Sequence, residues 1–269
     1  MTPRQPRSSL VAAGTSTKDT MELYFIRHAE AQTPSIDPRD PERLERLDRY
    51  GSGDYEGPLT ERGREQAKDA GRFLARKGIE TLLASPTTRA RQTAEIALAE
   101  AGLESDILLM EELREARIGF LHPERDPKLA RSMDRALMIN ETWRKITGRK
   151  VFLPVALYFV RLYMSSWLQG RTQGGESPDQ VRDRIGRVLD RIAAMDLQGA
   201  RIAVFTHGYV IYYLANHLVA PERKWRNIVS RPYVKNVSVT HLVRTRIGWA
   251  LRSYAQPIET HDTFGFGGA

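Results

Sequence analysis

The sequence predicts an α/β fold: a three-layer α/β/α sandwich with a mostly parallel central sheet and a helical cap insertion. Short apolar runs that are typical of buried parallel strands occur at residues 22–26, 80–85 and 201–206. Amphipathic helical patterns lie between these runs, and such alternation favours a parallel sheet with helices on both faces. The third observation is the segment 120–175, which breaks the alternation and looks helical, basic and unusually apolar. We interpret it as a cap, with an ordinary extension of the core as the alternative.

Two further strands are expected near the end of the chain. "VSVTHLV" (237–243) is rich in β-branched residues, and "WALRSYA" (249–255) has a similar character. The first strand of the chain is apolar on both faces, as a central strand of a parallel sheet is. Together the five runs supply a sheet large enough to carry two layers of helices.

The helices between these strands are marked by their capping residues. Thr60 is the expected N-cap of the first helix, and Gly78 is its expected stop. Ser85, followed by a proline, is the expected N-cap of the second. Ser177 and Gln180 form a capping-box pattern at the start of a third helix. Each helix therefore has a predicted start that does not depend on the strands.

The composition limits the classes of protein. Of the 269 residues, 41% are hydrophobic and 28% are charged, as in a globular protein that is not embedded in a membrane. The chain has no cysteine, which excludes disulfides, thiolate metal sites and a cysteine nucleophile, and suits a reducing compartment such as the cytoplasm. The longest apolar run, 151–160, contains a proline and is too short to span a bilayer, so no membrane partner is expected.

The net charge of +8 is concentrated in one internal segment, since residues 121–175 hold ten Lys/Arg and four Asp/Glu. Anionic small molecules, acidic partners or nucleic acid would suit this excess, and so would a plain solvated basic surface. Nucleic acid is not expected, because the basic residues form no known binding motif.

The predicted domain organisation is a disordered tail over 1–20, one α/β domain over 21–260 and a flexible tail over 261–269. The oligomeric state is left open.

Polar residues follow the predicted strands at the edge where ligands bind in open parallel sheets. Arg27 and His28 end the first strand, His207 ends another, and Arg89 lies in the first turn of the helix after a third. Two arginines can grip a phosphate through bidentate hydrogen bonds, while a neutral imidazole can attack phosphorus. A second histidine, partly protonated at neutral pH, can stabilise the phosphoryl oxygens. No metal or other cofactor is expected, because no Asp/Glu-His cluster has ligand spacing.

Each of these residues alone is more often structural than catalytic, but the motifs occur together. "YFIRHAEA", "LTERGREQA", "SPTTRARQTA", "LREARIG", "GGES" and "FTHGYV" follow one another in the chain. In this order they resemble the histidine phosphatase (phosphoglycerate mutase-like) superfamily, on its phosphatase branch, over residues 22–119 and 174–255. The resemblance implies that His28 is the nucleophile and forms a phosphohistidine. It also implies that Arg27, Arg89 and His207 complete the phosphate pocket.

The resemblance further implies that Glu115 of "LRE" is the general acid and base. Taken without the family, "EELREA" reads as a solvated charge cluster. An acid at this position must be protonated when the leaving oxygen departs, which requires a pKa raised by burial or by the incoming phosphate.

The chain departs from the family pattern just after the nucleophile. Ala29 replaces the usual glycine, and Pro34 stands where the family usually has an asparagine, so Thr33 is a candidate replacement in phosphate binding. Glu176 of "GGES" matches a family signature at the pocket mouth and is a secondary candidate for substrate binding, although helix capping also accounts for the Glu176-Ser177 step. Asn236 fits a family position at a strand start, although a simple turn residue is the preferred interpretation.

The resulting expectation is a metal-independent phosphomonoesterase that acts on a small phosphorylated metabolite. Phosphoglycerate mutase is the alternative enzyme, although "EARIGFLHPE" (115–124) lacks the Glu-Arg-His-Tyr-Gly continuation usual in mutases. A non-catalytic binding or scaffold protein on the same fold is the other alternative. Helical spacing places several of four basic cap residues on one face, which suggests a substrate with a second negative charge; they are Arg125, Lys128, Arg131 and Arg135.

Overall fold

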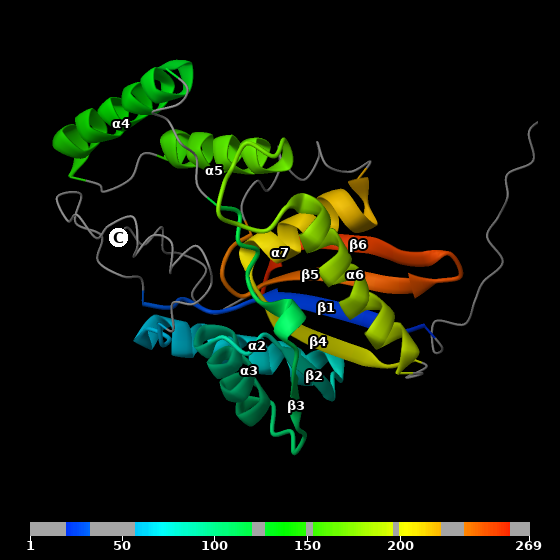
Figure 1. The fold of residues 1–269 in the computed structure, drawn as a ribbon. Helices are drawn as coiled ribbons and strands as arrows, with labels where there is room; N and C mark the ends of the chain where they lie inside the picture. The colour runs from blue at the N-terminus through cyan, green and yellow to red at the C-terminus, as the bar shows by residue number, and fades with distance from the viewer. Residues whose placement is uncertain are drawn as a thin grey trace, which may run out of the picture.

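The computed structural model describes residues 20–32, 57–119, 127–148, 153–195, 199–221 and 234–258. Its centre is a six-stranded sheet with the order β3-β2-β4-β1-β5-β6 (Figure 1). The four parallel strands are β1 (Glu22–Arg27), β2 (Thr81–Ala84), β3 (Ile107–Leu109) and β4 (Arg201–Thr206). Two antiparallel strands, β5 (Ser238–Thr245) and β6 (Gly248–Pro257), extend the sheet beside β1. The expected mostly parallel sheet is confirmed.

Alternate residues of the central strands pack into two separate cores. Leu23 and Phe25 of β1 lie in the core formed with α6 (Pro178–Ala194) and α7 (Gly208–Tyr213). Tyr24 and Ile26 lie in the opposite core, formed with α2 (Glu61–Lys77) and α3 (Thr88–Glu100). Because successive side chains of a strand point to opposite faces, a strand that is apolar throughout needs helices on both sides. The three-layer prediction is therefore confirmed, and Figure 1 shows the two helix pairs on either side of the sheet.

The predicted helix caps are confirmed at two of the three helices. Thr60 Oγ1 accepts a hydrogen bond from Gly63 N at 3.0 Å, and Gly78 ends α2 in the left-handed region with a φ of 59°. Ser177 and Gln180 form the expected capping box at the start of α6. These caps satisfy backbone groups that a helix end would otherwise leave without partners.

The predicted start of α3 is wrong by two residues. Thr87, rather than Ser85, is the N-cap, and the helix begins at Thr88. Ser85 is still held in an extended conformation, since its N–H donates to the carbonyl of Phe205 in β4 at 2.9 Å. Ser85 therefore stays paired with the sheet, and the helix starts after the turn at Pro86.

The sequence did not predict β3, which has only three residues and lies at the edge of the sheet. A short 3₁₀ helix, η2 (Glu111–Leu113), follows it, and a π-helical turn, η4 (Leu214–Val219), continues α7. Such short elements carry too few residues to show a period in the sequence.

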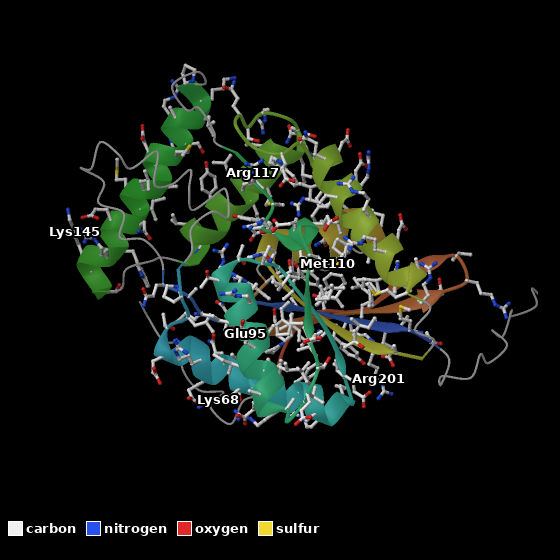
Figure 2. All side chains as sticks on the ribbon, turned by 60° about the horizontal axis from the view of Figure 1, so that its bottom comes forward. Lys68, Glu95, Met110, Arg117, Lys145 and Arg201 are labelled. Carbon is white, nitrogen blue, oxygen red and sulfur yellow. The ribbon has the colours of Figure 1, made fainter. Side chains whose placement is uncertain are left out.

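The segment expected to form a cap contains two long helices, α4 (Pro127–Thr147) and α5 (Leu153–Leu168). Figure 1 shows both outside the layers that cover the sheet. In Figure 2, Lys145 of α4 lies at the opposite end of the molecule from Arg201, which begins β4. That α4 and α5 cover a pocket stays a prediction.

The two predicted tails lie outside the described residues, except for Thr20 at the end of the first. Among the helices that the structure describes, none is both long and apolar enough to cross a bilayer.

Candidate active site

The first two residues of the site are brought together by strand pairing. β1 and β4 are parallel neighbours in a register that sets Arg27 opposite Thr206, so His28 and His207 leave the sheet side by side. The N–H of His28 donates to the carbonyl of Thr206 at 2.9 Å. The two imidazole rings are 5.2 Å apart between centroids, and both are buried, with exposed fractions of 7% and 0%. The predicted pair therefore meets at the carboxyl edge of the sheet.

His28 is held in one protonation form. Its Nδ1 lies 2.7 Å from the carbonyl oxygen of Ala29, and because a carbonyl only accepts, Nδ1 must carry the proton. The lone pair is then on Nε2. Burial lowers the pKa of His28 well below its usual value, and the charges of Arg27 and Arg89 lower it further. The ring is thus neutral at neutral pH, as a nucleophile requires.

Three contacts fix the backbone that carries His28. Asn236 Nδ2 donates to the carbonyl of His28 at 2.8 Å, and the N–H of Val237 donates to the carbonyl of Arg27 at 3.0 Å. On the other side, the N–H of Ala29 donates to Thr93 Oγ1 at 3.0 Å. Asn236 lies in a turn, as expected, but it also anchors the backbone of His28, which the preferred sequence interpretation missed.

The two predicted arginines approach the histidines from different elements. Arg27 Nη1 donates to the carbonyl of Val234 at 2.6 Å, and a Cβ added to Gly208 would lie 3.5 Å from Arg27 Nε. Arg89 lies in the first turn of α3 and is 7% exposed. Both positive charges lower the pKa values of His28 and His207, so their electrostatic effect converges on the same place. Two guanidinium groups there can balance a phosphate dianion.

His207 is fully buried and faces two hydroxyl groups. Its Nε2 lies 2.9 Å from Ser85 Oγ and 3.2 Å from Thr87 Oγ1. Burial is the main cause that lowers its pKa well below the usual value, and His28 and the arginines add to it. The sequence pattern predicted a partly protonated His207. The lowered pKa argues against that expectation, because burial beside two arginines favours the neutral ring.

Glu115 lies at the N-terminus of α7, where backbone N–H groups have no helical partners. Its Oε1 accepts from the N–H of Ala116 at 2.9 Å and of Val210 at 3.3 Å, and its Oε2 accepts from the N–H of Tyr209 at 3.4 Å. Burial raises the pKa of Glu115, although these hydrogen bonds and the charges of Arg89 and Arg27 oppose the shift. The carboxyl group is therefore biased toward the protonated form that a general acid needs.

The segment that carries Glu115 runs from Met110 to Arg117, both labelled in Figure 2. Arg184 of α6 holds it in place, because its Nη1 donates to the carbonyls of Glu112 at 2.5 Å and Arg114 at 2.9 Å. The expectation of a solvated charge cluster in this segment is thus only partly correct. Glu111 pairs with Arg114 on the exposed side, whereas Glu115 turns inward.

The other two predicted substrate-binding residues are placed differently. Both carboxylate oxygens of Glu176 accept from Arg184 at 2.8 Å, and the N–H of Arg117 donates to Oε2 at 3.1 Å. Glu176 therefore links α6 to the segment that carries Glu115, and its contact with a substrate stays a prediction. Thr33 and Pro34 lie outside the described residues. Across the described ranges, no group of three or more His, Asp or Glu side chains is placed to hold a metal ion.

Comparisons with known proteins agree with this arrangement. The model of the histidine phosphatase superfamily (branch 1) matches residues 23–147 and 159–257. A curated relative, the probable phosphoglycerate mutase GpmB of Escherichia coli, is 26% identical over 200 residues, which are 74% of this chain and 75% of that protein.

Similar solved structures share the fold at low identity. A putative alpha-ribazole-5'-P phosphatase from Escherichia coli has a TM-score of 0.55 at 21% identity, over 89% of this chain and 98% of that chain. A mycobacterial glucosyl-3-phosphoglycerate phosphatase has a TM-score of 0.58 at 19% identity, over 88% and 99%. A phosphoglycerate mutase from Bacillus anthracis has a TM-score of 0.56 at 21% identity, over 89% and 95%. With the family model matching most of its length and the family's fold around the paired histidines, the chain belongs to the histidine phosphatase superfamily.

Proposed function

We propose that this chain is a metal-independent phosphomonoesterase that acts on a small phosphorylated metabolite through a phosphohistidine at His28. The observation that carries the proposal is the pairing of two oppositely shifted groups in one buried place. The pKa of His28 is lowered, which favours the free base, and the pKa of Glu115 is raised, which favours the protonated acid. Such a pair can supply both a nucleophile and a proton donor.

The first chemical step transfers the phosphoryl group to the protein. The substrate phosphate docks between Arg27 and Arg89, and Nε2 of His28 attacks phosphorus in line with the ester oxygen. The P–N bond forms as the P–O bond breaks, and Glu115 gives its proton to the departing alkoxide. The second step reverses the role of Glu115, which takes a proton from water as the water oxygen attacks phosphorus. The P–N bond breaks, and inorganic phosphate leaves.

Direct detection of the intermediate tests this scheme. Turnover of a ³²P-labelled aryl phosphate is quenched in alkali, in which phosphohistidine survives. We expect label on the wild-type protein and none on His28→Ala, whose hydrolysis rate falls to background. Full activity in His28→Ala, or unlabelled wild-type protein during turnover, contradicts the scheme. Lys68→Ala is the matched surface control, because Lys68 lies exposed on α2 in an ion pair with Glu65.

Phosphoglycerate mutase is the second candidate, because curated relatives and one similar structure carry that name. Two other similar structures are named as phosphatases of alpha-ribazole-5'-P and glucosyl-3-phosphoglycerate. We favour the phosphatase, because the mutase continuation after the acid is absent from residues 115–124. Incubation with 3-phosphoglycerate decides between them: a mutase yields 2-phosphoglycerate, whereas a phosphatase yields free phosphate.

A non-catalytic binding protein is the third candidate. Hydrolysis of a generic aryl phosphate, inhibited by vanadate and unaffected by a chelator, rules it out. The absence of any hydrolysis, with tight phosphate binding, supports it instead. A cytoplasmic location stays a prediction.

The cap is the expected source of substrate choice. Lys128, Arg131 and Arg135 are exposed on α4, whereas Arg125 lies outside the described residues. We propose a substrate with a second negative charge. Replacing the three residues with alanine is expected to raise KM for bisphosphates more than for monophosphates. Equal changes in KM for the two kinds of substrate contradict the proposal.

A further inference from the structure

Three fully buried polar side chains meet at the end of β4. Ser85, Thr87 and His207 each have an exposed fraction of 0%. Ser85 Oγ and Thr87 Oγ1 are 3.2 Å apart, and both lie within hydrogen-bond distance of His207 Nε2, at 2.9 and 3.2 Å. Thr87 is the N-cap of α3, yet its hydroxyl makes no capping bond and is used for this contact instead. A side-chain cap normally stabilises a helix. The use of the Thr87 hydroxyl for the contact with His207 instead indicates another role.

A count of protons decides which nitrogen of His207 carries hydrogen. Among the described residues, the acceptors within reach of the two hydroxyl hydrogens are the other hydroxyl and His207 Nε2. If Nε2 carried the proton, one of the two O–H groups would be buried without an acceptor. If Nε2 carries the lone pair, Thr87 donates to Ser85, Ser85 donates to Nε2, and all three groups are satisfied. Buried polar groups are nearly always paired, so the second arrangement is favoured.

We propose that Ser85 and Thr87 are positioning residues that hold His207 as the Nδ1–H tautomer, so that Nδ1 donates a hydrogen bond to the transferring phosphoryl group. Within the described part of the chain, His207 Nδ1 is buried and has no hydrogen-bond partner. The ring lies 5.2 Å from that of His28, within reach of a phosphoryl group on the nucleophile. A ligand oxygen therefore completes the hydrogen bonding of His207.

The two histidines then share one tautomer and use it in opposite ways. His28 anchors Nδ1–H on the carbonyl of Ala29 and presents Nε2 as a base, whereas His207 anchors Nε2 on Ser85 and presents Nδ1–H as a donor. Since both rings are neutral, the positive charge of the pocket comes from Arg27 and Arg89 and matches a dianionic phosphate ester. This inference rests on the proposed function for its catalytic meaning, but the tautomer itself does not.

Nitrogen NMR on the wild-type protein tests the tautomer directly. The chain has six histidines, so ¹⁵N-histidine labelling with His207→Gln as the reference spectrum assigns the signal. At neutral pH we expect protonated Nδ1 and unprotonated Nε2 at His207, with a shift of the Nδ1 proton on addition of inorganic phosphate. A protonated Nε2 with a bare Nδ1 overturns the proposal, even if the labelling experiment shows a phosphohistidine.

Variants test the positioning role. Ser85→Ala/Thr87→Val removes both donors, and we expect kcat for an aryl phosphate to fall about 100-fold, as when one oxyanion donor is lost. Thr87→Ser keeps the hydroxyl and is expected to retain activity within about threefold, with the wild-type tautomer signal. Ser166→Ala, at another buried serine, is the control for hydroxyl loss. Wild-type kcat in a double variant that stays folded by circular dichroism overturns the role.

Discussion

His28 and Glu115 show how one environment shifts two groups in opposite directions, as their proposed roles require. Burial disfavours the charged form of any side chain, so it lowers the pKa of the imidazole and raises that of the carboxyl group. Arg27 and Arg89 act on both groups in the same direction, lowering both pKa values. The arginines thus reinforce the effect on His28 and oppose it on Glu115. At the residue scale, the protonation of Glu115 is the less strongly favoured of the two states, so Glu115 is the better target for mutation.

The role of Glu115 predicts a dependence on the leaving group. An aryl oxide such as nitrophenolate leaves without a proton, whereas an alkoxide needs one. Glu115→Gln is therefore expected to lower kcat about 10³-fold for an alkyl phosphate but only about tenfold for nitrophenyl phosphate. Steady-state kinetics with both substrates check this. Equal losses on the two substrates would mean that Glu115 does not donate the proton.

The sequence predicted those site residues that follow apolar strands, and missed those whose role depends on distant contacts. Arg27, His28 and His207 follow from the strand ends. Asn236 is 208 positions from His28 in the chain, so its hydrogen bond leaves no local pattern. Thr87 contacts His207, 120 positions away, instead of capping α3. This contact leaves no local sequence pattern for the same reason.

At the scale of elements, Gly63 lets α2 approach the loop that follows His28. A Cβ at Gly63 would lie 1.9 Å from the carbonyl oxygen of Glu30, two residues after His28. Gly63→Ala is therefore expected to lower the free energy of unfolding by about 1–3 kcal/mol and to reduce activity. Gly186→Ala is the matched control, because a Cβ there meets nothing within 4 Å and alanine suits a helix better by about 0.5–1 kcal/mol. Urea unfolding of both variants checks the opposite signs.

Arg184 links α6 to the segments that carry Glu176 and Glu115. It pairs with Glu176, with side-chain exposures of 13% and 16%, and holds two carbonyls just before Glu115. Arg184→Met leaves a partly buried carboxylate without its cation, so we expect a loss of about 2 kcal/mol in unfolding free energy. Activity is expected to fall as well, because the segment that carries Glu115 loses its anchor.

The control for Arg184 lies on the same helix. Arg182 pairs with Asp179 at exposures of 50% and 76%, so Arg182→Met is expected to change stability by less than about 0.5 kcal/mol. Chemical denaturation of the two variants measures the difference. Similar losses in both variants would show that the partial burial of the Arg184–Glu176 pair does not set its contribution to the free energy of unfolding.

Long elements were predicted more accurately than short ones. Strands that are apolar on both faces and helices with clear caps gave bounds within a few residues, because local pattern and tertiary packing agree there. β3 and η2 have three residues each, and they are defined by tertiary contacts, β3 with β2 and α3 and η2 with α6. At the start of α3, strand pairing at Ser85 overrode a good capping sequence.

At the scale of the whole molecule, the site is assembled from segments that the chain order keeps far apart. β1, the start of α3, the segment after η2 and the end of β4 each supply one part, and the sheet order brings them to one edge. The site therefore exists only when both cores are formed. Its buried histidines are also part of the folding energetics, since they must stay neutral in the folded protein.

This coupling predicts how stability depends on pH. The pKa values of His28 and His207 are lowered well below 6.5 in the folded state, so the unfolded chain binds more protons as the pH falls through 6.5. The contribution of these histidines to stability is present above that pH and is lost below it, at most about 1.4 kcal/mol for each between pH 7.5 and 5.5. Glu115, whose pKa is raised, acts in the opposite direction, since its folded form binds the extra proton. With two histidines against one carboxyl group, we expect unfolding free energies in phosphate-free urea to fall over this range. His28→Asn/His207→Asn should flatten the slope, and an unchanged slope would show that the two rings are not kept neutral by the fold.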